Sequence, residues 1–288
     1  MDYTVPTSKK NTAEFLNQIP KYKELEGKVV LVTGGTGDLG KEICLFFAAQ
    51  NSHVIVSSKN NSENNTGNLL QILSEISPKA NHTYISADIT DEKDIKNMFD
   101  TIYEKFGTLD VLVNSVGILG SNLIVEESQD QSKHVFAINY FGPRNTCREF
   151  ILRKTEEYKE RSIDDKTNVY SRIIILSSIM SKTGNVGQSS YSASKAALNI
   201  LTQSLSDEIQ KKYKLHNFTI NAISPGIIDT KMAHEVPERV RDMCLKQIPM
   251  NRFGKAEEIA QTALFIASKG AGYITGKIFE VDGGWYNG

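Results

Sequence analysis

The sequence predicts an α/β fold in which a doubly wound parallel sheet lies between two layers of helices. A β-branched run, 29–33, is followed by a glycine-rich turn and then by a helical pattern. Further short apolar runs alternate with helical segments as far as a last strand at 277–281. The alternation has no break and no internal repeat, so we expect one domain with right-handed crossovers.

Hydrophobic periodicity and turn residues set the boundaries of the individual elements. The expected strands are residues 29–33, 53–56, 83–87, 109–114, 172–177, 218–223 and 277–281. The expected helices follow Gly40, cover 67–77 and 91–106, start near 126, run from about Tyr191 to Lys212, and include two within 233–268. The hydrophilic segment 153–171 is interpreted as a helix extension and a surface loop.

Residues 1–26 differ from the rest of the chain because they are polar, with only a weak apolar patch at Phe15, Leu16 and Ile19. We interpret them as an N-terminal extension that lies along the surface or against a partner subunit. The alternative is disorder. Residues 27–288 then form a single domain.

Composition excludes several classes of partner. The 288 residues include 33 basic and 34 acidic side chains, a net charge of −1, which does not favour nucleic acid or an acidic membrane surface. The three cysteines show neither a disulfide framework nor a zinc spacing, and no histidine pattern suggests a metal site. No apolar run approaches membrane-spanning length. We therefore expect a cytoplasmic protein, without a metal, that acts on small molecules.

The glycine-rich turn follows the first strand and precedes a helix with Ile43, Phe46 and Phe47 on its inner face. In this context glycines let the backbone approach the pyrophosphate of a dinucleotide, which rests on the helix N-terminus. The turn runs Gly34, Gly35, Thr36, Gly37, Asp38, Leu39, Gly40. Asp38 brings a like charge close to a pyrophosphate, so it must point away or cap the helix. The alternative is a tight turn that only packs helix on strand.

The second strand ends in Ser58 and Lys59 rather than in an acidic residue. An acidic residue there binds the ribose 2′-hydroxyl of NAD, whereas hydroxyl and ammonium donors suit the 2′-phosphate of NADP. The residues therefore favour NADP(H); an ordinary polar loop is the alternative. Asp88 follows the third strand, where its carboxylate could accept from an adenine amino group. Asp91 is expected to cap the next helix.

Two residues suggest acid–base chemistry. A spacing of four places Tyr191 and Lys195 on one helix face, and a nearby cation would stabilise a phenolate at neutral pH. Alone, such a pair is more often a solvated helix face. Ser178 follows an apolar strand at its carboxyl end, where its hydroxyl could donate to a substrate carbonyl, unless it is only a strand-end or capping residue. Asn139 is expected within a helix, where its amide needs a partner.

In their order along the chain, these residues resemble the short-chain dehydrogenase/reductase family across 27–286. The matching residues are Thr33-Gly34, Asp88, Asn114 to Gly117, Asn139, Ser178, Tyr191, Lys195, Pro225-Gly226 and Val281-Asp282-Gly283-Gly284. The resemblance implies a single-domain Rossmann fold. It also implies that Tyr191 is the general acid or base, that Ser178 polarises the carbonyl, that Lys195 lowers the Tyr191 pKa and binds the nicotinamide ribose, and that Asn139 holds a relay water.

The arguments above and the resemblance together give the expected cofactor contacts. They are Gly34, Thr36, Gly37, Asp38, Leu39, Gly40, Ser58, Lys59, Asp88, Ile89, Asn114, Val116, Gly117, Tyr191, Lys195, Pro225, Gly226, Ile228 and Thr230. The chain departs from the single-domain branch of the family at Asp38, at Ser115-Val116 and in an insertion at 154–170, which is expected to change an entrance or a subunit contact.

The end of the chain looks most like 3-oxoacyl-acyl-carrier-protein reductases, a likeness that relatives with unrelated substrates share. We expect 231–250, with Met232, Val236, Met243 and Leu245, to form a helical lid over the substrate; core packing and oligomer contact are the alternatives. The resemblance also implies a homodimer or homotetramer in which the tail 283–286 reaches a neighbour.

The first hypothesis is an NADP(H)-dependent oxidoreductase that transfers hydride between nicotinamide and a carbonyl or secondary alcohol. An NAD-linked secondary-alcohol dehydrogenase is the alternative within the fold. A cofactor-binding or regulatory protein without catalysis is the alternative of another class. The intact set Asn139, Ser178, Tyr191 and Lys195 argues against this last alternative, and Asp38 argues for it.

Overall fold

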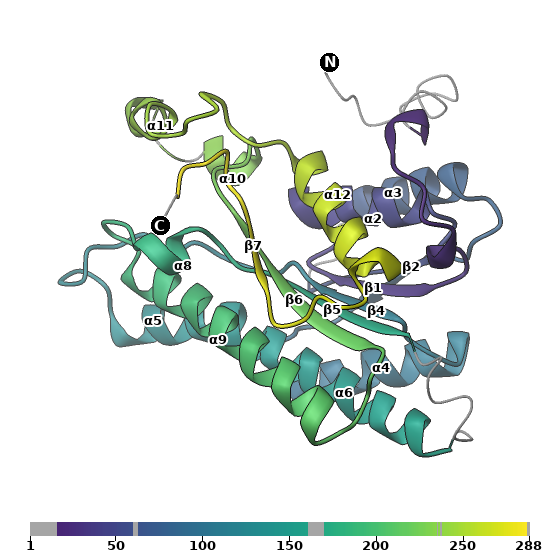
Figure 1. Ribbon diagram of the computed structural model, residues 1–288. Helices are drawn as coiled ribbons and strands as arrows, with labels where there is room; N and C mark the ends of the chain where they lie inside the picture. The colour runs from purple at the N-terminus through teal and green to yellow at the C-terminus, as the bar shows by residue number, and fades with distance from the viewer. Residues whose placement is uncertain (1–15, 60–62, 161–169, 235, 237, 287–288) are drawn as a thin grey trace.

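The computed structural model describes residues 16–59, 63–160 and 170–286, except 235 and 237. Seven of their strands form one sheet in the order β3-β2-β1-β4-β5-β6-β7, and all neighbours are parallel. The strands are β1 Val29–Thr33, β2 His53–Ser58, β3 Thr83–Ser86, β4 Val111–Asn114, β5 Ser171–Leu176, β6 Phe218–Pro225 and β7 Ile278–Val281. This is the doubly wound sheet that the alternation predicted (Figure 1).

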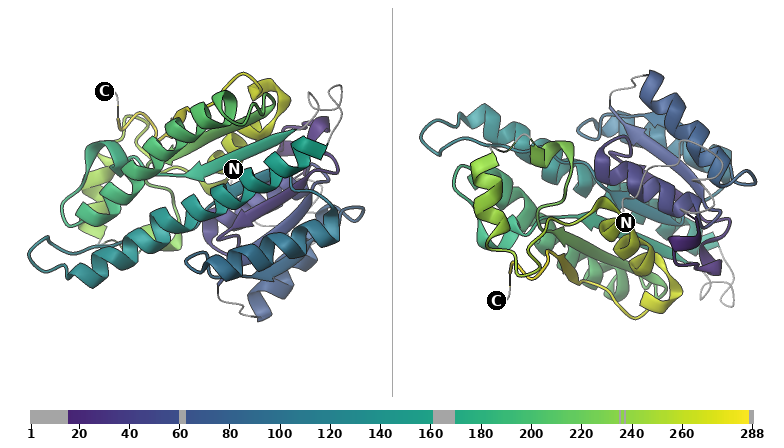
Figure 2. Two further views of the ribbon diagram at one scale, coloured as in Figure 1. Left: turned by 90° about the horizontal axis from the view of Figure 1, so that it is seen from below. Right: turned by 90° about the horizontal axis from the view of Figure 1, so that it is seen from above.

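Helices cover both faces of this sheet, so the domain has three layers (Figures 1 and 2). The α-helices are α2 Asp38–Ala48, α3 Glu63–Ile76, α4 Glu92–Phe106, α5 Gln129–Phe136, α6 Gly142–Glu160, α8 Met180–Thr183, α9 Ser189–Lys211, α10 Lys231–His234, α11 Glu238–Leu245 and α12 Ala256–Ala267. The described residues also form the 3-10 helices η1 Lys23–Leu25 and η3 Lys269–Ala271 and the π-helical turn η2 Ala137–Phe141. One core lies under α2, α3 and α12, and the other lies under α4, α6 and α9.

Some boundaries differ from the sequence prediction for local reasons. The helix expected from about 126 begins at Gln129, because Ser128 forms a capping box with Gln131. The expected cap at Asp91 is confirmed, since its carboxylate accepts from the N–H groups of Lys93 and Asp94. Helix α6 continues to Glu160, so the first part of the segment 153–171 is helical, as predicted. Residues 161–169 lie outside the described part of the chain.

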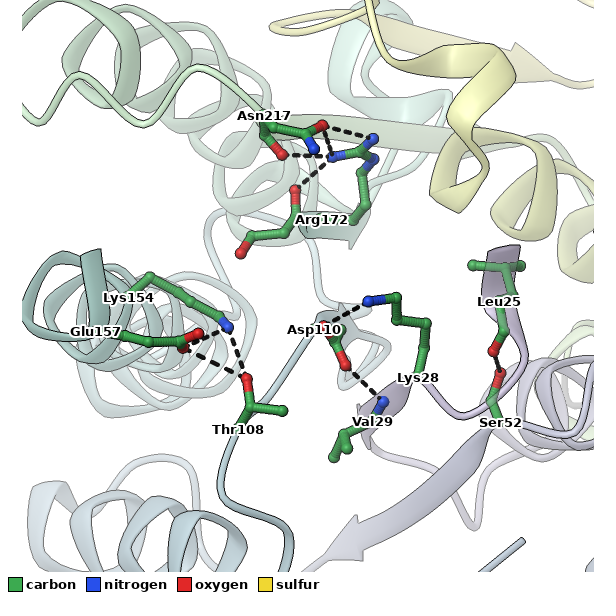
Figure 3. Close-up of polar contacts among 11 residues, drawn as sticks. Leu25, Lys28, Val29, Ser52, Thr108, Asp110, Lys154, Glu157, Arg172 and Asn217 are labelled. Atoms are coloured by element: carbon green, nitrogen blue, oxygen red, sulfur yellow. Dashed lines mark hydrogen bonds and ion pairs between the residues drawn. The ribbon is translucent and has the colours of Figure 1, made fainter. Parts of the chain in front are cut away.

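Polar ties hold the amino-terminal edge of the sheet together (Figure 3). The Asp110 carboxylate accepts from the Val29 N–H at 2.9 Å and lies 3.2 Å from the Lys28 ammonium. The buried Lys154 ammonium donates to Glu157 at 2.7 Å and to Thr108 at 2.9 Å. These bonds satisfy groups that burial would otherwise leave unpaired. They fix the base of the domain, at the opposite edge from the carboxyl ends of the strands.

The described part of the N-terminal extension packs on this domain. Ile19 and Leu25 are buried in the core under α2. The Lys21 ammonium donates to the Ala49 carbonyl at 2.8 Å, and the Tyr22 N–H donates to Gln50 at 2.9 Å. Residues 16–26 thus lie along the surface near the end of α2, while residues 1–15 are outside the described part. None of the described helices combines the length and the apolar character that crossing a bilayer requires.

Candidate active site

The turn between β1 and α2 brings the backbone very close to itself. Gly34 has a positive φ of 66°, which favours glycine. A Cβ on Gly40 would lie 2.2 Å from the Gly34 carbonyl oxygen, so only glycine fits there. The amino terminus of α2 opens into a cavity of about 560 Å³, lined by Thr36, Gly37, Asp38, Leu39, Gly40, Ser115, Gly117, Ile118, Leu119, Thr230 and Lys231. The free N–H groups of a helix terminus suit a pyrophosphate.

Asp38 does not cap its own helix, in which Gly37 is the N-cap residue. Its carboxylate instead accepts a hydrogen bond from the Lys231 N–H, at 2.8 Å. Lys231 is the first residue of α10, so the carboxylate is directed to the start of the expected lid. This is the first of the two orientations that the sequence allowed.

Lys59 and Asp88 meet each other at the ends of β2 and β3. The Lys59 ammonium lies 2.7 Å from an Asp88 carboxylate oxygen, and Asp88 also accepts from the N–H and hydroxyl of Thr90. Partial burial raises the pKa of Asp88, but hydrogen bonds from Lys59 and Thr90 outweigh it and lower the pKa to about 2. Ser58 shares a 3.1 Å hydrogen bond with the Tyr84 hydroxyl. The sequence had assigned Lys59 and Asp88 to different parts of a cofactor.

Ser178, Tyr191 and Lys195 lie together at the carboxyl end of β5. The Lys195 ammonium is 5.9 Å from the centroid of the Tyr191 ring, one helical turn away on α9. It donates to the Leu176 carbonyl at 2.9 Å. The Tyr191 phenol forms a hydrogen bond with the Ser178 hydroxyl, which also accepts from the Met180 N–H at 3.2 Å.

Burial shifts both titratable groups of this cluster. It raises the pKa of the Tyr191 phenol, and the hydrogen bond with Ser178 offsets only part of that increase. It lowers the pKa of the Lys195 ammonium to about 8. The resemblance implied that the Lys195 ammonium lowers the pKa of Tyr191; in this structure that ammonium donates to the Leu176 carbonyl.

Asn139 lies in the π-helical turn η2 and is fully buried. Its amide accepts from the Ile118 N–H at 2.9 Å and donates to the Ile118 carbonyl at 3.0 Å. It also donates to the Ser194 hydroxyl at 3.2 Å. Asn139 therefore has the partners that a buried amide needs, and it ties the segment after β4 to α9.

The expected cofactor residues after β3 and β4 divide into two groups. Asn114 is buried and its amide oxygen accepts from the hydroxyls of Thr33 and Thr146, so its side chain faces the interior. Ile89 is buried as well and packs against Gly142, where a Cβ would come within 2.4 Å of it. Gly117 instead lines the cavity at α2, and a Cβ on it would lie 3.1 Å from the Lys195 nitrogen. Val116 follows directly on the Ser115 backbone that Gly34 approaches.

A second cavity, of about 780 Å³, adjoins the first and contains the Ser178 and Tyr191 side chains. Leu39, Leu119 and Thr230 line both cavities. Pro225, Gly226 and Ile228, which are among the expected cofactor contacts, are also in its wall. The loop between β4 and α5, the segment 185–188 and the helices α10 and α11 complete it.

Segment 231–250, for which the sequence predicted a lid, contributes residues to the cavity wall, but only some of those that were named. Val236 lines the cavity, whereas Met243 is 55% exposed and Leu245 is not among the lining residues. The Met232 side chain lies outside the described part. Sequence reasoning missed Ala233, Val240, Arg241, Cys244 and the tail residue Trp285. Helical spacing of 240, 241 and 244 on α11 was the available signal.

Trp285 lines the cavity of its own chain, and its indole N–H donates to Gln247 at 3.2 Å. This tail was expected to reach a neighbouring subunit. Among the described residues, no group of three or more His, Cys, Asp or Glu side chains is placed to hold a metal ion.

The chain is similar to known proteins over most of its length. A family model described as enoyl-(acyl carrier protein) reductase matches residues 36–286. The 3-oxoacyl-[acyl-carrier-protein] reductase FabG of Thermotoga maritima is 33% identical over 260 residues, covering 90% of this chain and 98% of the relative. FabG of Salmonella typhimurium is 31% identical over 261 residues, covering 91% and 98%.

A solved structure from Agrobacterium tumefaciens, provisionally assigned as a gluconate dehydrogenase, superposes with a TM-score of 0.81. It is 23% identical and covers 91% of this chain and 96% of that one, which supports the fold. The sheet, the glycine-rich turn and the relatives at 31–33% identity lead to one conclusion. The chain belongs to the short-chain dehydrogenase/reductase family of NAD(P)-dependent oxidoreductases.

Proposed function

We propose that this oxidoreductase uses NADPH to reduce a carbonyl of the 3-oxoacyl type. The observation that carries the proposal is that Ser178 and Tyr191 lie in a largely apolar cavity that shares three lining residues with the cavity at the α2 terminus. A cofactor on α2 and a substrate beside Tyr191 would therefore meet. The names of the relatives in the comparison favour a 3-oxoacyl substrate.

The residues around α2 fit a dinucleotide. The close packing of Gly34 and Gly40 leaves the start of α2 beside a cavity, where a pyrophosphate would meet the helix N–H groups. Gly117 lines the same cavity and lies close to the Lys195 ammonium, which would bind the ribose. When bound, the dihydronicotinamide supplies a hydride to the carbonyl carbon.

The protein's own groups handle the developing charge and the proton. The Ser178 hydroxyl would donate a hydrogen bond to the carbonyl oxygen, which becomes an alkoxide as the carbon is reduced. The Tyr191 phenol would then give its proton to that oxygen, leaving a phenolate that solvent reprotonates. Because burial raises its pKa, the phenol is protonated at neutral pH, as a general acid must be. Lys195 would bind the ribose, and Asn139 would hold a relay water beside Ile118.

Replacement of Tyr191 by Phe tests this function. We expect NADPH binding and the melting temperature to be retained, while kcat for carbonyl reduction falls by roughly 10²- to 10⁴-fold. Tyr213→Phe is the matched control, because Tyr213 lies on the surface just after α9. Near-normal turnover by the Tyr191 variant would rule out the assignment.

An NAD-linked dehydrogenase is the second candidate, and the Lys59–Asp88 ion pair is the observation in its favour. The Asp88 carboxylate pairs with the Lys59 ammonium, which would otherwise face a 2′-phosphate. Paired titrations with NADPH and NADH, followed by energy transfer from Trp285 and the tyrosines, separate the two candidates. Tighter binding of NADPH supports the first and tighter binding of NADH the second. The non-catalytic alternative has no support once the family is established.

We also propose that the chain forms a homodimer or homotetramer through α6 and α9, and that it works in the cytoplasm. Phe141, Leu152 and Ile200 leave large apolar side chains exposed on or beside these helices. Sedimentation equilibrium of the wild type and of Ile200→Glu tests the interface; a monomeric wild type would contradict it. Cys44, Cys147 and Cys244 are free thiols, which suits a reducing compartment.

A further inference from the structure

The substrate cavity contains a cation that the proposed reduction does not use. Arg241 lies on α11 and lines the 780 Å³ cavity, most of whose other side chains are apolar. The centre of its guanidinium is 5.5 Å from the centroid of the Phe253 ring. That ring holds one face of the planar group and leaves its edge for hydrogen bonds.

The hydrogen-bonding capacity of Arg241 is not used within the described part of the chain. Its Nε is shielded from solvent and has no acceptor there. Arg241 forms no ion pair with any described Asp or Glu. Glu126, the acidic side chain in the cavity wall, is on the exposed loop before α5. A shielded donor without an acceptor costs free energy, and a ligand that supplies oxygens recovers it.

We propose that Arg241 selects substrates that carry an anionic group, a carboxylate or a phosphate, at the end away from the reacting carbonyl. The edge of a guanidinium offers two parallel N–H donors, which match the paired oxygens of either group. Ser178 and Tyr191 come from the segment after β5 and from α9, whereas Arg241 comes from α11, a separate element of the structure (Figure 1).

The size and lining of the cavity fit such a substrate. A volume of about 780 Å³ is in the upper part of the range for small-molecule sites, so it accommodates more than a small ketone. Ile179, Met180, Val186 and Val240 would contact an apolar spacer between the carbonyl and the anion. This inference rests on the proposed function, because it places the reacting carbonyl at Ser178 and Tyr191.

Binding can be measured without turnover because Trp285, the only tryptophan of the chain, lines the same cavity. The enzyme, saturated with NADP⁺, is titrated with two matched pairs. One pair is a medium-chain oxo acid and its methyl ester; the other is a 3-oxoacyl thioester of 4′-phosphopantetheine and of pantetheine. We expect the anionic member of at least one pair to bind roughly 10- to 100-fold tighter. The pair that discriminates identifies carboxylate or phosphate. Equal binding within both pairs overturns the proposal.

Variants of α11 show whether Arg241 causes the discrimination. Arg241→Gln should abolish the difference within the pair, and Arg241→Lys should retain part of it as a point charge. Arg239→Gln is the matched control, because Arg239 is exposed on the same helix and does not line the cavity. Discrimination by Arg241→Gln equal to that of the wild type also overturns the proposal.

The proposed reduction is tested separately, by NADPH oxidation with the neutral members. Turnover of the neutral members with no preference for the anions contradicts the role of Arg241 alone. Arg241-dependent binding of the anions, without turnover of any member, supports the anion site and contradicts the reduction.

Discussion

The Asp38 carboxylate and the Lys231 N–H, separated by 193 positions in the sequence, form a 2.8 Å hydrogen bond between the glycine-rich turn and α10. Asp38 lies in the first turn of α2, and Lys231 begins α10. A residue that looks unfavourable for a pyrophosphate therefore has a defined partner. It connects the start of α2, where we propose that the cofactor binds, to α10, which contributes Ala233 to the wall of the second cavity.

Two substitutions of Asp38 separate its charge from its hydrogen bond. Asp38→Asn keeps an oxygen acceptor for Lys231 and removes a charge that repels pyrophosphate, so we expect NADPH to bind about fivefold tighter. Asp38→Ala also removes the acceptor and should raise the KM for the carbonyl substrate, because the base of α10 is released. Fluorescence titration and initial rates measure the two effects. Equal KM values for the two variants would show that the hydrogen bond does not position the lid.

Lys59→Ala should weaken NADPH binding by roughly 3- to 10-fold and leave NADH binding unchanged, since an exposed ammonium contributes modestly to binding a phosphate. Asp88→Asn releases Lys59 from its ion pair and should strengthen NADPH binding. Both effects should shrink in high salt, because the groups are near solvent. Equal losses for NADPH and NADH in Lys59→Ala would argue against a contact with the 2′-phosphate.

Lys195 should make cofactor binding depend on pH. Its ammonium, with a pKa lowered to about 8 by burial, becomes neutral above that pH and loses a charge-assisted contact to the ribose hydroxyls. The Kd for NADPH of the wild type should therefore rise as the pH passes through about 8. Lys195→Met should bind more weakly but with little change between pH 7 and 9. The same alkaline limb in both proteins would assign it to another group.

The same ammonium should affect stability in the alkaline range. An unfolded lysine titrates near pH 10.4, so between about pH 8 and that value the unfolded chain binds the proton that the folded one releases. The free energy of unfolding contributed by this group therefore increases as the pH rises through this window, and the cost of burying the charge is fully present below about pH 8. Denaturant titrations of the wild type and Lys195→Met should differ least at the alkaline end.

Gly40→Ala and Gly37→Ala form a matched pair in the cofactor turn. The new methyl group would lie 2.2 Å from the Gly34 carbonyl oxygen in the first variant and 3.4 Å from it in the second. We expect Gly40→Ala to cost roughly 1–3 kcal/mol of stability and to lose NADPH affinity, because the turn must shift. Gly37→Ala should do little. Thermal melts and NADPH titrations compare them, and a well-tolerated Gly40→Ala would mean that the turn is looser than its geometry indicates.

Sequence reasoning found the fold because local periodicity determines it. Strand, glycine-rich turn and helix follow each other within 29–48. The end of β5 places Ser178, and the first turn of α9 places Tyr191, in the wall of one cavity. Sequence reasoning could not find the contacts between side chains that follow different strands. The sequence assigned Lys59 to a 2′-phosphate and Asp88 to an adenine amino group, although the two side chains form an ion pair with each other. Arg241 was missed because the lid was identified by its large apolar residues, whereas the cation on the same helix faces the cavity.

The polar ties among Asp110, Val29, Lys154 and Thr108 imply that amide hydrogen exchange differs between the two edges of the sheet. Amides at this base, such as that of Val29, are held by buried partners and should exchange with solvent only when the whole domain unfolds. Those of α10 and α11 lie in short, largely exposed helices and should exchange through local opening. Denaturant would thus accelerate exchange at the base while leaving exchange in the lid nearly unchanged. The enzyme can admit and release ligands at one edge without loosening the scaffold that aligns Ser178 with Tyr191.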